Sequence, residues 1–340
     1  MLPQDRILSQ ADEKAIAILS DFLPDKIFDM HMHYRLPSFN PSAFKPGACS
    51  TVVGDAVTMD TYIRDHGRFY PNKENIRGNL IIVPDKAMLN DPKTMRQAAV
   101  DSLVCELDKH PGCVGEVPIL AQDTREDIES LLVHPRIRGL KCYHLTAGKD
   151  NTWQCTIGEY LPEAAWEIAN ERGLCITLHM VRDLALADEE NRNYICKKAA
   201  QYPNARLILA HAARGFAAWT AVESVEQVAN YPNIYFDFSA ICDPVPIMAI
   251  IQACGHKRVF WGSDYPVSML RGTCVSIGAD FLWLYRKQLE SCGSNTKFEP
   301  YLIGLQNLMA MRTACKLLKL SKQEIEDIFY NNAVAFFHLT

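Results

Sequence analysis

The sequence predicts an α/β fold, a (β/α)8 barrel, and three observations lead to this fold class. Short apolar runs typical of buried strands alternate with helical patterns along most of the chain, which indicates parallel strands joined by crossover helices. No Gly-x-Gly-x-x-Gly turn or phosphate-binding loop occurs, which argues against an open doubly wound sheet. A chain of 340 residues has the length of one barrel with insertions. We therefore expect a single domain over residues 1–340.

The predicted elements follow one another in a regular order. A helix over Ala11–Leu23, ended by Pro24, precedes the first strand. Eight strands are predicted, at Ile27–His33, Ile76–Val83, Cys113–Ile119, Ile137–Tyr143, Leu174–His179, Arg206–His211, Ile234–Phe238 and Arg258–Asp264. The helical patterns between them cover Pro92–His110, Glu126–Leu132, Leu161–Arg172, Glu189–Gln201, Trp219–Asn230 and Val245–Cys254. The barrel strands thus run from residue 27 to residue 264.

Two long segments interrupt this alternation. Tyr34–Asn75, rich in Pro, Gly and Asn, follows the first strand and contains one predicted helix around Asp60–His66. Met269–Phe298 follows the last strand. Long loops in compact domains are usually functional, so we expect both to emerge from the catalytic face and to cover the site. The chain then closes with helices in residues 300–340, at Pro300–Leu318 and Lys322–Phe337.

Composition excludes several classes of protein. Hydrophobic residues make up 48% of the chain, as in ordinary globular enzymes, and the net charge of -5 comes from interspersed acidic and basic residues. There is no basic stripe for nucleic acid and no amphipathic or polybasic membrane anchor. The first 23 residues carry four carboxylates and no long apolar core, which argues against a signal peptide. We therefore expect a cytoplasmic protein that binds neither nucleic acid nor membrane.

The twelve cysteines are scattered, and none forms a Cys-x-x-Cys pair. In a large chain without a secretion signal, this pattern indicates reduced and mostly buried thiols rather than a disulfide framework. A zinc-thiolate site has no support in the sequence.

Metal-competent side chains fall at the ends of four predicted strands. His31 and His33 end the first strand two residues apart, so both imidazoles point to the same face. His179, His211 and Asp264 end the fifth, sixth and eighth strands. In a (β/α)8 barrel all strand carboxyl ends open onto one face, where active sites lie. The sequence therefore predicts a metal site there, although each residue alone would more simply be a polar strand end.

The donor set indicates the chemistry. Imidazole nitrogens with a carboxylate oxygen suit zinc or another borderline divalent ion, and a site with open positions is catalytic. Such an ion lowers the pKa of its water to about 7 or polarises a substrate oxygen. Asp264 is the candidate for shuttling the proton of that water. His211 either completes the set of ligands or acts as the base behind it.

With these residues in place, the chain resembles the amidohydrolase superfamily. The resemblance is carried by "FDMHMHY", "GLKCYH", "ITLHM", "LILAHAARG", "VFWGSDYP" and "EIEDIFYNNAVAFF". Within this superfamily, the chain resembles the amidohydrolase-2 branch, which contains small-acid hydrolases and metal-dependent decarboxylases. The resemblance implies one divalent ion, Zn²⁺ with Mn²⁺ as the alternative, held by His31, His33, His179 and Asp264. It also implies that His211 activates water or substrate, and that the protein is a homo-oligomer, a dimer.

Three further inward-facing charges have open roles. Lys141 on the fourth strand lies deeper than the carbamylated lysine that bridges two metals in binuclear relatives, and we favour a role as a cation for a substrate carboxylate. Glu116 on the third strand is either a metal ligand or the ion-pair partner of Lys141. Asp29, on the same face as His31, is either an acceptor that fixes an imidazole tautomer or a structural carboxylate.

Basic and aromatic side chains at the rim indicate an acidic small-molecule substrate. Arginine binds carboxylates through two parallel hydrogen bonds, and the candidate cations are Arg35, Lys141, Arg182 and Arg214. Tyr143 and His144, just after the fourth strand, are candidates for lining the pocket.

Three functions remain compatible with the sequence. The first is a metal-dependent hydrolase of a lactone, amide or related C–O or C–N bond in a small carboxylate-bearing molecule. The second is a non-oxidative decarboxylase or hydratase of an unsaturated or aromatic acid, which would use the same residues. The third is a catalytically inactive binding barrel.

Overall fold

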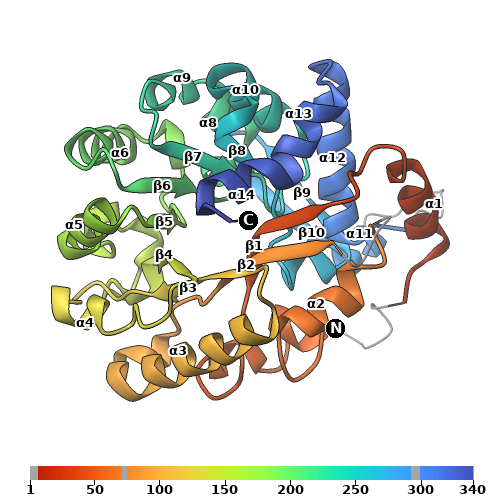
Figure 1. Ribbon diagram of the computed structural model, residues 1–340. Helices are drawn as coiled ribbons and strands as arrows, with labels where there is room; N and C mark the ends of the chain where they lie inside the picture. Colours follow the sequence, from red (N-terminus) through yellow and green to blue (C-terminus); the bar gives the residue numbers. More distant parts are fainter. Residues whose placement is uncertain (1–6, 71–74, 292–298, 340) are drawn as a thin grey trace.

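Eight parallel strands form the centre of the molecule, in the order in which they occur along the chain. The computed structural model describes residues 7–70, 75–291 and 299–339. The strands are β1 (Ile27–His33), β2 (Ile76–Ile81), β3 (Val114–Pro118), β4 (Ile137–Cys142), β5 (Cys175–Leu178), β6 (Arg206–Leu209), β7 (Ile234–Asp237) and β8 (Val259–Phe260). Helices surround them (Figure 1), and the predicted (β/α)8 barrel is confirmed.

The barrel closes between β8 and β1. The backbone N–H of His33 donates to the carbonyl of Tyr265 at 2.9 Å, and that of Asp264 donates to the carbonyl of His31 at 2.8 Å. Regular strand geometry in β8 ends at Phe260, so the predicted strand to Asp264 is too long. These seam hydrogen bonds nevertheless hold the ends of the first and last strands side by side.

The helices agree with the predicted alternation but are shorter in places. They are α1 (Gln10–Leu19), α2 (Met59–His66), α3 (Pro92–Lys109), α4 (Arg125–Glu129), α5 (Glu163–Arg172), α6 (Glu189–Gln201), α7 (Ala210–Arg214), α8 (Ala218–Val222), α9 (Val225–Ala229), α10 (Pro244–Cys254), α11 (Arg286–Ser291), α12 (Ile303–Leu317), α13 (Lys322–Glu326) and α14 (Asn332–Phe337). The predicted helix 219–230 is split, because Ser224 leaves the helical region with φ −128° and ψ −16°. The predicted helix 322–337 is interrupted by a π-helical turn, Asp327–Asn331, whose Ile328 carbonyl accepts from the N–H of Trp261 at 3.0 Å.

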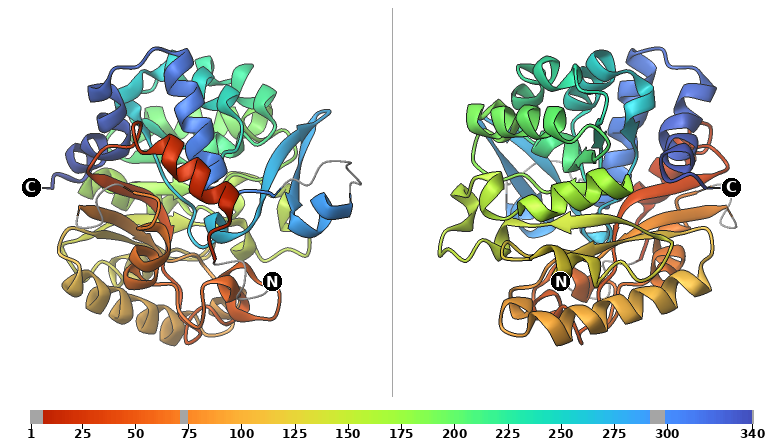
Figure 2. Two further views of the ribbon diagram at one scale, coloured as in Figure 1. Left: turned by 90° about the vertical axis from the view of Figure 1, so that its right-hand side faces the viewer. Right: turned by 60° about the vertical axis from the view of Figure 1, so that its left-hand side comes forward.

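Helix α14 closes the amino-terminal end of the barrel. Phe336 and Phe337 pack with Phe28 and Phe260 in a small apolar cluster. The opposite end carries a hairpin, β9 (Gly272–Ile277) and β10 (Asp280–Tyr285), so the segment after β8 is not simply a loop. In the left view of Figure 2 the C-terminus and the hairpin lie on opposite sides of the molecule. The open end of the barrel is therefore the one at which the strands finish.

The long segment after β1 contains two short 3-10 turns, Pro41–Phe44 and Cys49–Val52, followed by α2, which confirms the helix predicted around Asp60–His66. Residues 71–74 of the first long segment and residues 292–298 of the second lie outside the described residues. Within the described residues every cysteine is free, as the cysteine pattern predicts. None of the described helices combines the length and apolarity needed to cross a bilayer.

Candidate active site

His31 lies near the carboxyl end of β1, and its two ring nitrogens have different surroundings. Its Nδ1 lies 2.9 Å from Oδ2 of Asp237, the last residue of β7, and both side chains are fully buried. Its Nε2 is buried and has no hydrogen-bond partner among the described residues. A carboxylate on one nitrogen fixes the proton there and leaves the other nitrogen with a free lone pair, which is the usual arrangement for a metal-binding histidine.

His33 and Asp264 lie beside that free nitrogen. His33 Nε2 is 2.8 Å from Oδ1 of Asp264. One ligand atom from each of His31, His33 and Asp264 lies within 4.8 Å of the others, and all three residues are buried. The seam between β8 and β1 therefore brings two imidazoles and one carboxylate into the spacing that a divalent ion requires.

A second group with the same spacing contains His31, His211 and Asp237. Its carboxylate, however, is already fully used by the protein. Oδ1 of Asp237 accepts from the N–H of His211 at 3.1 Å, from the N–H of Ser239 at 3.0 Å and from the Ser239 hydroxyl, while Oδ2 accepts from His31. We therefore read Asp237 as the group that orients His31, and the group containing Asp264 as the one that fits an ion.

Burial and neighbouring charges keep this cluster in its metal-binding protonation state. Burial, reinforced by the positive charge of Arg35, lowers the pKa of His33 well below its usual value. Burial alone would raise the pKa of Asp264, but the neighbouring His211 and the hydrogen bond from His33 hold it below its usual range. A neutral imidazole and an ionised carboxylate are the forms that coordinate metals.

The sequence predicts that His211 ends the sixth strand, and this is wrong. His211 begins a left-handed turn after β6. Residues His211, Ala212, Ala213 and Arg214 all have φ between 53° and 58°. Nδ1 of His211 lies 2.8 Å from the Ser239 hydroxyl and 3.2 Å from the Ser239 carbonyl. The ring centroid is 4.9 Å from that of His31, and burial lowers the pKa of His211. The turn thus places a neutral, oriented imidazole against the cluster.

His179 follows the last residue of β5 and belongs to neither group of ligand atoms found in the described part of the chain. Its ring centroid lies 5.2 Å from that of His211 and 4.6 Å from that of Tyr143. Burial, together with the neighbouring His211 and Lys141, lowers the pKa of His179 well below its usual value. The structure therefore places His179 beside the cluster as a neutral imidazole.

Lys141 and Glu116 lie inside the barrel below the cluster and do not form the predicted ion pair. Within the described chain, no carboxylate lies within 4.0 Å of the Lys141 amine, which is buried without a hydrogen-bond partner. Glu116 Oε1 instead accepts from Asn79 at 2.6 Å and from Thr177 at 2.7 Å. Burial lowers the pKa of Lys141 and raises that of Glu116. Both groups thus retain one uncommitted polar atom deep in the barrel.

Asp29 has a structural role rather than the predicted alternative of fixing an imidazole. Its Oδ1 accepts from the backbone N–H of His31 at 3.0 Å and from that of Ser263 at 2.9 Å. It therefore fastens the end of β1 to the residue before Asp264.

The candidate substrate-binding residues surround the opening of the barrel. His144 Nδ1 lies 2.8 Å from the Thr152 hydroxyl, and its Nε2 is buried without a partner among the described residues. Arg35 and Arg214 have no carboxylate within 4.0 Å in the described chain, whereas Arg182 is paired with two acidic residues at 2.9 and 2.6 Å. Of the candidate cations, Arg182 is therefore the one already neutralised by carboxylates of the protein.

Sequence reasoning missed Asp237 and Ser239. Asp237 ends β7 in the same way that His31 and His33 end β1, so the rule that selected those residues also selects it. Ser239 carries no such signal, because a serine after a strand is common. The hairpin β9–β10 was also missed as a component of the rim.

Comparison with known proteins identifies the family of the chain. Residues 93–339 match the family described as Amidohydrolase. An L-fucono-1,5-lactonase from Burkholderia ambifaria is 27% identical over 185 residues, which cover 50% of this chain and 60% of the lactonase.

Two solved structures show the same fold at low identity. A zinc-bound amidohydrolase from Burkholderia multivorans has a TM-score of 0.56 and 12% identity, covering 93% of this chain and 100% of that one. A 5-carboxyvanillate decarboxylase from Novosphingobium aromaticivorans, solved with manganese, has a TM-score of 0.57 and 13% identity, covering 92% of this chain and 96% of that one. The family match extends over most of the chain, and the protein belongs to the amidohydrolase family.

Proposed function

We propose that the protein is a metal-dependent hydrolase. Its substrate would be a small carboxylate-bearing molecule, cleaved at a lactone, amide or related C–O or C–N bond. One observation carries the proposal: His31, His33 and Asp264 bring their ligand atoms within 4.8 Å of one another at the open end of the barrel. The lactonase relative, which matches half of this chain, supports hydrolysis.

The donor set fits a divalent ion, and we propose Zn²⁺, with Mn²⁺ as the alternative. His31, His33 and Asp264 would hold it, because the buried Nε2 of His31 has no other partner among the described residues. We add His179 to the ligand set on its position after β5. When bound, the ion supplies Lewis acidity and makes a water molecule acidic enough to lose its proton near neutral pH.

The protein's own groups would manage the protons and the substrate. The Asp264 carboxylate, held in its ionised form, accepts the proton of the attacking water. The oxygen of that water bonds to the acyl carbon, the C–O or C–N bond breaks, and the leaving group takes the proton that Asp264 accepted. Ser239 holds the neutral His211 ring in place, where it would orient the attacking water. The proposed substrate-binding groups are Lys141, Arg214, Arg35, Tyr143 and His144.

Non-oxidative decarboxylation is the second candidate. The observation in its favour is the buried Lys141 amine, which lacks a carboxylate partner in the described structure. A substrate carboxylate directed toward this cation and the metal cluster would lie where carbon dioxide could leave. A proton taken from water by Asp264 or His211 would then go to carbon.

The test combines metal analysis with a substrate panel. Purified protein should contain about one equivalent of zinc or manganese per chain, and His33→Ala should lose it, while His134→Ala, at the barrel periphery, should keep it. The metal-loaded protein is then incubated with sugar lactones, aryl amides and hydroxylated benzoic acids. Uptake of one water per product supports the proposed hydrolase activity. Release of carbon dioxide without uptake of water would contradict it and support decarboxylation instead. A metal-free protein with no turnover would refute both. Cytoplasmic location and dimer formation remain predictions.

A further inference from the structure

Two guanidinium groups at the opening of the barrel form no ion pair with a carboxylate in the described residues, and Asp280 and Asp183 act on one of them, Arg214, only from a distance. Arg35 and Arg214 are both partly buried, and neither lies within 4.0 Å of an acidic side chain in the described residues. Arg182, which is also partly buried, differs from them because it contacts Asp188 and Glu190. Unneutralised and partly desolvated guanidinium groups at an active-site opening are expected to bind anions.

Arg35 lies on the side of the site formed by β1. It follows His33 by two residues, and its Nη1 donates to the Ser50 hydroxyl at 3.2 Å. A second contact, to the Cys49 sulfur at 3.5 Å, is weak and neutral. These contacts orient the guanidinium group while leaving its charge unpaired.

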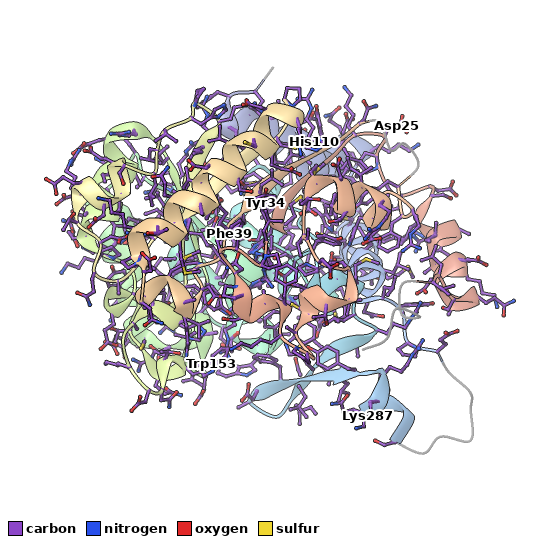
Figure 3. The ribbon with its side chains drawn as sticks, turned by 90° about the horizontal axis from the view of Figure 1, so that it is seen from below. Asp25, Tyr34, Phe39, His110, Trp153 and Lys287 are labelled. Atoms are coloured by element: carbon purple, nitrogen blue, oxygen red, sulfur yellow. The ribbon has the colours of Figure 1, made fainter. Side chains whose placement is uncertain are left out.

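Arg214 lies on the side formed by β6 and the hairpin. Its Nη1 donates to the Arg182 carbonyl at 2.7 Å. Its guanidinium carbon is 5.7 Å from the centre of the Trp153 ring and 5.0 Å from that of Phe281 on β10. In Figure 3, Trp153 lies on the same side of the molecule as the hairpin, whose following helix carries Lys287. Two aromatic rings and one carbonyl thus hold Arg214 in place.

Tyr143 is close enough to both cations for their charges to affect it, and its ring contacts that of His179. Its ring centroid is 4.6 Å from that of His179. Burial raises the pKa of Tyr143 to about 12; the positive charges of Arg35 and Arg214 oppose this rise, and Asp264 reinforces it. One hydroxyl is therefore within electrostatic reach of both guanidinium groups and of the cluster carboxylate.

Aromatic rings form a wall next to His211 and Arg214. The Phe216 ring stacks on that of His211, with centroids 5.6 Å apart, and contacts Phe281 at 5.0 Å and Trp283 at 5.2 Å. Phe281 and Trp283 belong to β10, so the hairpin supplies part of the wall. Flat rings pack well against such surfaces through offset or edge-to-face contacts.

We infer that the substrate is a planar acid with two separated anionic groups, one for Arg35 and one for Arg214, whose ring packs against the Phe216–Phe281–Trp283 wall. This inference rests on the proposed function and narrows its substrate class. A dianion satisfies both guanidinium groups at once, whereas a single carboxylate leaves one of them desolvated and unpaired. A planar ring between the charges keeps them apart without the entropy cost of ordering a flexible chain.

The test is calorimetric binding to the zinc-loaded protein, with isophthalate against benzoate, and glutarate as a flexible dianion. Isophthalate should bind about tenfold more tightly than benzoate, the effect of one additional charge-assisted contact. It should also bind more tightly than glutarate, whose flexible chain must be ordered and which has no ring to pack against the wall. Arg35→Gln and Arg214→Gln should each remove this advantage while zinc content stays unchanged. Arg35→Lys, which keeps the charge, should retain part of it, and Arg312→Gln, on α12 away from the opening, should retain all of it.

Equal affinity for isophthalate and benzoate would overturn the inference, as would an isophthalate advantage that survives both glutamine substitutions. Equal affinity for isophthalate and glutarate would overturn its planar-ring part. Failure of the proposed function is distinguishable, because it appears as absent turnover of the substrate panel and leaves these binding comparisons intact.

Discussion

Replacing Asp237 by Asn tests whether this carboxylate orients His31, a proposed metal ligand. Asn keeps the size and one carbonyl oxygen, which can still accept from the N–H groups of His211 and Ser239. Its amide group then faces Nδ1 of His31, which lies 2.9 Å from the carboxylate oxygen that it replaces. Because an amide N–H donates, it favours the tautomer whose proton is on Nε2. That proton would occupy the lone pair directed at the ion.

The expected cost follows from the position of Asp237 behind a single ligand. Loss of such a hydrogen-bond partner typically lowers metal affinity 10- to 100-fold, which corresponds to about 1.4–2.7 kcal/mol. Zinc affinity is measured at pH 7.5 by competition with a chromophoric chelator, and circular dichroism checks the fold. Asp243→Asn is the matched control, because Asp243 only caps α10. A zinc affinity within twofold of the unmodified protein would refute the orienting role.

Further predictions concern the seam, the pH dependence of stability and metal removal. Gly262→Ala should reduce zinc affinity about tenfold, because the added Cβ would lie 2.8 Å from Cβ of His31 and displace it; an unchanged affinity would contradict this close packing. Burial lowers the pKa of His66 to about 3, so the unfolded chain binds one more proton between pH 6.5 and 3 and stability falls as the pH drops; by pH 5 the loss is about 2 kcal/mol. Urea denaturation of His66→Gln should show a pH slope about one proton smaller over pH 5–6.5, and an identical slope would reject the assignment. Zinc at 100 times its dissociation constant should stabilise the chelator-treated protein by about 2.7 kcal/mol in the same denaturation assay.

The sequence allowed the barrel to be predicted because its evidence is repeated along the chain. Each strand is a short apolar run followed by a helical pattern, and an error in one element leaves the others intact. The same frame brought His31, His33 and Asp264 together, since all strand ends of a barrel open onto one face. Residues more than two hundred positions apart were thus grouped without any knowledge of distances.

Local backbone geometry and side-chain pairing could not be predicted in this way. Ala212 and Ala213 give no indication of positive φ, because left-handed residues are usually Gly, Asn or Asp. Lys141 and Glu116 are close in the barrel, yet Asn79 and Thr177 take up the carboxylate. Which neighbour satisfies a buried charge depends on side-chain packing, and strand periodicity contains no information about it.

The left-handed turn after β6 carries two of the proposed functional groups. His211 and Arg214 are its first and last residues, so the imidazole beside His31 and the guanidinium at the opening belong to one short piece of backbone. Each alanine between them costs about 1–2 kcal/mol in this conformation, which the surrounding packing must offset. A substitution that relaxes the turn would displace His211 and Arg214 together. Changes of specificity are therefore better introduced on β10, where Phe281 and Trp283 can vary without moving His211.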